Sequence, residues 1–73
     1  MKSFHEGRIA RAARAIAARL ENQPEVRLYV RSERAEDKIL RIHHYMNRYI
    51  GKYCFEWWAG IDENMIVVQK IEN

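Results

Sequence analysis

The segment Met65-Ile66-Val67-Val68 (MIVV) is the part of the chain that decides the fold, because it holds four consecutive apolar residues. Side chains of a β-strand alternate between the two faces of a sheet, so a strand that is apolar at every position is buried on both faces. Such a strand suits the centre of a sheet rather than its edge. We therefore predict that the strand spanning residues 65–71 lies between two other strands.

A second strand is predicted just before it, at residues 52–59. This segment contains YCFEWW at positions 53–58, with four of the eight aromatic residues of the chain. A loop that contains Gly60 separates the two apolar segments, which is typical of a β-hairpin. Alternation places Tyr53, Phe55 and Trp57 on one face and Cys54, Glu56 and Trp58 on the other. We expect the first set to face the core.

Ser32 to Gly51 is predicted to form an amphipathic helix. Ser32 is a favourable N-cap, and acidic residues follow it in the first turns, where the helix dipole favours negative charge. Gly51 suits the left-handed conformation that closes many helices. The apolar residues recur at helical spacing and predict a buried stripe. That stripe comprises Ala35, Ile39, Ile42, Met46, Tyr49 and Ile50.

The N-terminal part of the chain predicts a helix followed by a strand. In residues 8–20 (RIARAARAIAARL) the apolar stripe is formed by Ile9, Ala13, Ile16 and Leu20. Residues 26–31 alternate strictly, with Val26, Leu28 and Val30 on the core side and Arg27, Tyr29 and Arg31 on the other. The Arg- and Ala-rich helix also has the composition of an organellar presequence. We favour a structural role, because too little chain would remain to fold without it.

Together these segments predict a single α+β domain over residues 1–73, in the order helix-strand-helix-strand-strand. A strand-helix-strand crossover makes the first two strands parallel, and the hairpin makes the third antiparallel to the second. Two sheet orders fit this connectivity. We favour the split β-α-β arrangement, with the third strand central, because residues 65–68 are apolar on both faces. Both helices are expected to pack on one face of this sheet, which gives a two-layer structure.

No pattern in the sequence predicts catalysis, a metal or a cofactor. Cys54 with His43 or His44 would need an orienting third group and an oxyanion site, and no spacing supplies either. Adjacent histidines on a helix diverge by about 100°, so we expect one to be half-buried and one solvated rather than a metal pair. The three glycines are isolated, unlike those of phosphate-binding loops. We therefore predict that the protein is not an enzyme and takes no cofactor and no small-molecule substrate.

The strongest pattern outside the predicted core is a basic stripe on the second helix. Its members recur at i, i+4, i+7, i+11, i+14 and i+18, so they share one face. They are Arg34, Lys38, Arg41, Tyr45, Arg48 and Lys52. A row of cations with an interposed ring suits a phosphate backbone and a stacked base, and it also suits an acidic protein surface. The alternative is a solvated face, neutralised by i, i+4 pairs with Glu33, Glu36 and Asp37.

The face of the sheet that points away from the helices is a second candidate surface. Arg27, Tyr29, Arg31 and Trp58 gather there, and aromatic residues beside arginines are typical of binding hot spots. Such an exposed apolar patch is unusual on a monomer, so we predict a homodimer formed through this face or through an edge strand. Strand parity makes Glu56 the nearest candidate partner for Arg27 and Arg31.

The function that these patterns favour is nucleic-acid binding, to RNA or DNA, by a small basic protein. The net charge of +3 is modest for that role. The alternative is a phage or mobile-element accessory protein, an anti-CRISPR-like inhibitor that binds and blocks a host protein machine. A lone cysteine predicts a reducing compartment. The sequence contains no run of about 18 apolar residues, so it predicts no membrane-spanning helix. We therefore expect a cytoplasmic protein that does not bind a membrane.

Overall fold

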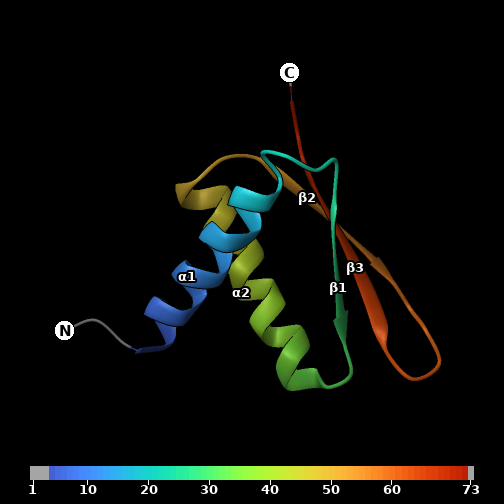
Figure 1. Cartoon of the computed structure of the whole chain (residues 1–73). Helices are drawn as coiled ribbons and strands as arrows, with labels where there is room; N and C mark the ends of the chain where they lie inside the picture. The colour runs from blue at the N-terminus through green and yellow to red at the C-terminus, as the bar shows by residue number, and fades with distance from the viewer. Residues whose placement is uncertain (1–3, 73) are drawn as a thin grey trace.

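The computed structural model describes the backbone of residues 4–72 and the side chains of residues 7–72. Two helices and three strands alternate in the predicted order (Figure 1). They are α1 (Phe4–Arg19), β1 (Val26–Val30), α2 (Glu33–Tyr49), β2 (Tyr53–Trp58) and β3 (Asn64–Lys70). The Cα atoms span 38 × 33 × 16 Å, so the molecule is flat, as expected for one helical layer on one sheet.

The sheet has the order β1-β3-β2, which confirms that the last strand is central. β3 is antiparallel to both neighbours, so β1 and β2 are parallel to each other, as predicted. In the register Val68 lies between Val26 and Phe55, and Ile66 lies between Leu28 and Trp57. Ile66 and Val68 are fully buried, and Val67, on the opposite face, is only 8% exposed. Residues 66–68 of the MIVV segment are therefore all buried, although Val67 points to the opposite face from Ile66 and Val68.

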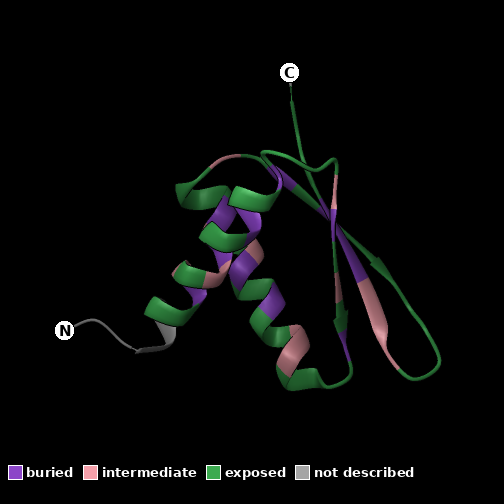
Figure 2. Ribbon diagram, in the orientation of Figure 1, coloured by how far each residue is buried: buried purple, intermediate pink, exposed green. Residues whose placement is uncertain are grey.

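Both helices lie on the same side of the sheet (Figure 1) and bury their apolar stripes against it and against each other. Figure 2 shows that the buried positions follow the inner sides of the helices and the strands. The predicted stripe of α1 is buried at all four positions, and the one of α2 is buried at Ile39, Ile42 and Met46. His43 is half-buried and stacks on Phe55, with ring centroids 4.2 Å apart, whereas His44 is exposed.

The C-terminal end of α2 differs from the prediction. The helix ends at Tyr49, and the N–H groups of Ile50 and Gly51 both donate to the carbonyl oxygen of Met46 at 2.9 Å. Gly51 does not have the left-handed conformation, because no described glycine has a positive φ. Tyr49 and Ile50 are 64% and 38% exposed, so their predicted burial was wrong. The core of this layer ends at Met46, one turn earlier than the apolar spacing suggests.

Trp57 is a second correction. It lies on the core side of the sheet, opposite Ile66, yet 37% of its surface is exposed. β2 is an edge strand, so Trp57 has a cross-strand neighbour on one side only. On helix α2, the His43 ring stacks on Phe55 and covers it. The helix covers Trp57, at the other end of β2, less completely. Strand parity gave the correct face, but it carries no information about where the helical layer ends.

Asn47 joins the end of α2 to the start of β2. Its Oδ1 accepts a hydrogen bond from the N–H of Tyr53 at 2.7 Å, and its Nδ2 donates to the carbonyl oxygen of Tyr53 at 3.2 Å. The Tyr53 side chain is itself buried. The side-chain amide of Asn47 thus satisfies both the N–H and the carbonyl group of Tyr53, and this contact fixes where β2 begins.

Replacing Asn47 by Ala is expected to lower the free energy of unfolding by about 1–3 kcal/mol, because two part-buried backbone groups lose their partners. Urea denaturation followed by far-ultraviolet circular dichroism measures this change. Asn22→Ala is the matched control, since Asn22 is exposed like Asn47 but its side chain makes no hydrogen bond among residues 7–72. It should change the stability by less than about 0.5 kcal/mol. Equal effects of the two substitutions would contradict a structural role for the Asn47 amide.

Candidate nucleic-acid interface

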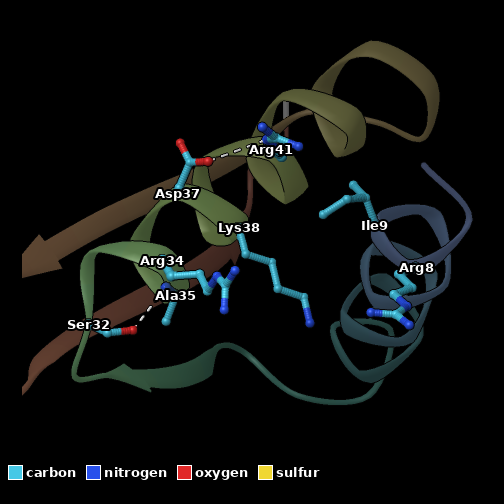
Figure 3. Close-up of a pocket in the computed structure, with 8 residues that line it drawn as sticks. All are labelled: Arg8, Ile9, Ser32, Arg34, Ala35, Asp37, Lys38 and Arg41. Atoms are coloured by element: carbon cyan, nitrogen blue, oxygen red, sulfur yellow. Dashed lines mark hydrogen bonds and ion pairs between the residues drawn. The ribbon is translucent and has the colours of Figure 1, made fainter. Parts of the chain in front are cut away.

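A basic groove lies between the two helices, at the N-terminal half of α2 (Figure 3). It encloses a volume of about 710 Å³. Helix α1 contributes Arg8 and Ile9, and α2 with its N-cap contributes the remaining lining residues. These are Ser32, Arg34, Ala35, Asp37, Lys38 and Arg41. In Figure 3 the Lys38 side chain extends into the space between the helices, with Arg34 on one side and Arg8 across it.

The groove concentrates the positive charge of the protein. Its lining has four cations and one carboxylate, a net charge of +3, which equals the net charge of the entire chain (13 basic less 10 acidic residues). Asp37 Oδ2 lies 3.5 Å from Arg41 Nε, so the carboxylate is engaged with the cation one turn along the helix. Arg8, Arg34 and Lys38 form no ion pair among the side chains of residues 7–72. Within this described part of the chain, three cations thus have no carboxylate partner and can bind an anion.

The basic stripe predicted from sequence is divided between different surroundings. Arg34, Lys38 and Arg41 line the groove. Arg48 lines a shallower depression with Leu40, His43, His44 and Asn47. Lys52 lies beyond the end of α2, and its carbonyl oxygen accepts a hydrogen bond from Ile71. Of the acidic residues expected to neutralise the stripe, Asp37 pairs with Arg41, whereas Glu36 accepts a hydrogen bond from Asn64.

Tyr45 and Tyr49 exchange the roles that sequence gave them. Tyr45, predicted as the exposed ring of the stripe, is half-buried against the core, and its hydroxyl accepts a hydrogen bond from Arg14 Nη2 at 3.4 Å. Tyr49, predicted to be buried, is exposed and contacts Tyr45 with ring centroids 4.7 Å apart. The Arg48 guanidinium carbon lies 5.8 Å from the Tyr49 ring centre. Of the two tyrosines on α2, Tyr49 is therefore the one whose ring is available for stacking.

Two groups at this site were missed by sequence reasoning. Arg8 lies outside the apolar stripe predicted for the first helix, and its approach to α2 depends on how the two helices pack. Tyr49 fits the apolar spacing of α2, and only the early end of the core leaves it exposed. The excess of arginine on the polar side of α1 was the one signal for Arg8.

The open face of the sheet carries the second set of predicted residues. Tyr29 and Trp58 flank Met65 in one cross-strand row, and they are 57% and 53% exposed. Arg27 and Glu56 flank Val67 in the next row. Arg27 Nε donates a hydrogen bond to Glu25 Oε2 at 2.6 Å. This contact raises the pKa of Arg27 above its ordinary value.

Strand parity suggested Glu56 as the partner of Arg27 and Arg31, but both arginines pair with other carboxylates. Arg31 Nε donates to Glu63 Oε1 at 3.1 Å, and Arg27 is bound to Glu25. Glu56 forms no ion pair with either of them, because the central strand lies between Glu56 on β2 and Arg27 on β1. Among the side chains of residues 7–72, its carboxylate forms no ion pair and can interact with solvent or with another molecule.

The Cys–His pair and the metal site that were considered from the sequence are not formed among residues 7–72. Cys54 is exposed on the open face, whereas His43 stacks on Phe55 on the helical face, so the sheet separates the thiol from the imidazole. No group of three or more His, Cys, Asp or Glu side chains lies close enough to hold a metal ion within residues 7–72. Neither of the helices in the described part of the chain has the length and apolar character needed to cross a bilayer.

The different roles of the two tyrosines can be separated by stability. Tyr45→Ala is expected to lower the free energy of unfolding by about 1–2 kcal/mol, because a half-buried ring leaves the core. Tyr49→Ala should change it by less than about 0.5 kcal/mol, because its ring is mostly solvated. Thermal and urea denaturation of both variants measure the difference. A larger loss for Tyr49→Ala would contradict its assignment as a surface ring.

No family model matches the chain, and comparisons with curated proteins and with solved structures found no match. A function must therefore be inferred from the groove and the sheet face themselves.

Proposed function

We propose that the protein is a non-enzymatic nucleic-acid-binding protein that holds the phosphate backbone of RNA or DNA in the groove between α1 and α2. The observation that carries this proposal is the convergence of Arg8 from α1 with Arg34 and Lys38 from α2, all without an ion-pair partner within residues 7–72. Phosphates are the most abundant anions that such a cluster of guanidinium and ammonium groups binds, and their contacts dominate nucleic-acid affinity.

The dimensions of the basic surface suit a short single-stranded segment. At a rise of about 1.5 Å per residue, Arg34 and Arg41 are separated by roughly 10 Å along the helix axis. A strand stacked as in a duplex rises about 3.4 Å per nucleotide, so this length corresponds to about three stacked nucleotides. Tyr49 lies roughly 12 Å farther along α2. Phosphates in the groove and a base stacked on Tyr49 together give a site of about seven nucleotides, within the usual range for single-strand binders.

The proposal includes a homodimer formed through the open face of the sheet. The groove is on the helical side of the molecule, whereas Tyr29 and Trp58 are on the opposite face. Dimerisation through that face leaves each groove accessible. The two surfaces predicted from the sequence are therefore compatible with each other, one for nucleic acid and one for a second copy.

An acidic protein surface is the second candidate ligand for the groove. Arginine binds carboxylates in the same bidentate geometry as phosphates, so Arg8 and Arg34 suit either partner. An inhibitor of a host protein machine would use this groove to cover an acidic working surface. Recovery of partners from a lysate separates the two functions: nuclease treatment should abolish recovery if the ligand is nucleic acid and leave a stoichiometric protein if it is not.

The double substitution Arg8→Ala/Lys38→Ala is expected to weaken binding to a single-stranded oligonucleotide at least about tenfold at low salt. Each lost phosphate contact should reduce the slope of log affinity against log salt by about 0.7, so the double variant should lose about 1.4. Fluorescence anisotropy over a salt series measures both quantities. The control is Arg11→Ala/Arg19→Ala, which removes two exposed arginines of α1 outside the groove.

Tyr49→Ala distinguishes stacking from electrostatics in the same assay. Loss of one stacked base should cost about 1–3 kcal/mol of binding free energy and leave the salt slope unchanged. If the control variant loses as much slope as the groove variant, charge acts only through the overall net charge and the groove is no site. An unchanged slope in the groove variant would exclude phosphate binding there.

A further inference from the structure

The open face of the sheet is self-complementary, because its three strands bear a fixed pattern of charge. One row across the sheet reads Arg27, Val67, Glu56, with a cation on β1, an apolar residue on β3 and a carboxylate on β2. The next outward-facing row reads Tyr29, Met65, Trp58. The charges at the two edges are opposite, and the central strand is apolar. A second copy of the same face can match this pattern only in a particular orientation.

We propose that two copies of the chain pack open face to open face about a two-fold axis that runs parallel to the strands, along β3. This assignment rests on the homodimer proposed above and specifies its geometry. Rotation about such an axis reverses the order of the strands, so β1 of one copy lies over β2 of the other, while β3 lies over β3. Each cross-strand row then meets its own copy in reverse.

The charges match in this orientation. Arg27 lies over the partner's Glu56, and Glu56 lies over the partner's Arg27, so two ion pairs form around the Val67 contact. Arg27 uses its Nε for Glu25, and the guanidinium group keeps other N–H donors for a second carboxylate. Its side chain is 58% exposed in the single chain and is therefore accessible.

The apolar groups match in the same orientation. Tyr29 lies over the partner's Trp58, and Met65 lies over its own copy at the axis. Tyr29 and Trp58 are each more than half exposed in the single chain, so they provide most of the apolar surface that becomes buried. Sheets packed face to face lie about 10 Å apart, a distance that large aromatic side chains can span.

The other simple two-fold arrangement is disfavoured by charge. An axis that lies in the interface but runs across the strands puts each strand over its own copy. When that axis passes through the Val67 row, Arg27 meets the partner's Arg27 and Glu56 meets the partner's Glu56. Like charges in contact at an interface are repulsive. Wherever that axis passes, β1 lies over β1 and β2 lies over β2, so it never brings Arg27 over the partner's Glu56. Only the axis along β3 pairs these opposite charges.

The contact is small, which sets the expected affinity. The six residues form two rows about 7 Å apart on three strands, so they cover a face of roughly 14 by 14 Å. Such an area lies below that of standard protein interfaces, so we expect a dissociation constant on the order of 10 μM or weaker. Cys54 lies on β2, away from the axis, and its copy lies on the other side of the dimer. No disulfide joins the two, because its formation requires Cα atoms within about 7 Å.

Sedimentation equilibrium of the full chain with reductant, from about 10 to 500 μM, tests the dimer over the range that a small interface requires. We expect a monomer–dimer equilibrium. Arg27→Glu and Glu56→Arg, each alone, should raise the dissociation constant at least about tenfold, because like charges then meet. The double variant Arg27→Glu/Glu56→Arg should restore it to within about threefold of the original. Arg11→Glu, an equal charge change on the exposed side of α1, is the matched control.

The possible outcomes separate the dimer from its geometry. A monomer at every concentration overturns the homodimer and leaves nucleic-acid binding untouched. A dimer that both single reversals leave intact overturns the axis along β3 and indicates another arrangement in which Arg27 and Glu56 do not meet, such as pairing through an edge strand. A dimer that both reversals disrupt without rescue by the double variant overturns the pairing of Arg27 with Glu56. Circular dichroism of each variant establishes that the chain remains folded.

Discussion

The pairing of β3 with strands on both of its edges is the contact on which the rest of the structure depends. β1 and β2 are parallel and do not touch each other, so only β3 joins them into one sheet. Val68 and Ile66 also form the fully buried floor under both helices. The helices in turn form the groove, because Arg8 and Lys38 approach each other only when α1 and α2 pack on the same face of the sheet. The charge cluster is thus a consequence of sheet order.

The fold could be predicted from the sequence because its determinants are local. The four apolar residues at 65–68 indicate a central strand, and alternation along residues 26–31 and 53–58 assigns the faces. Ser32 caps α2, with its Oγ accepting a hydrogen bond from the N–H of Ala35 at 3.1 Å. The errors occur at the limits of the layers. Tyr49, Ile50 and Trp57 have the right periodicity for burial, but no part of the structure extends far enough to cover them.

The candidate site could be predicted only in part, because it joins residues distant in the chain. Helical spacing identified Arg34, Lys38 and Arg41 as neighbours, since one element carries all three. Arg8 belongs to another helix, and Asn47 acts through the backbone of Tyr53. Periodicity within an element contains no information about such contacts. Lys52 was placed on the stripe by extending the helical spacing past the residue at which the helix ends.

The late position of β3 in the chain also affects how the molecule folds. Because this strand is central, β1 has no partner in the sheet until residues 64–68 have been synthesised, at a separation of more than thirty residues. Before that point the nascent chain contains two amphipathic helices and two unpaired strands, whose apolar faces are open to other molecules. Non-local pairing of this kind slows folding and prolongs the exposure of aggregation-prone segments. The sheet is therefore completed only after residues 64–70 have been made, and the segments that precede them depend on β3 for protection.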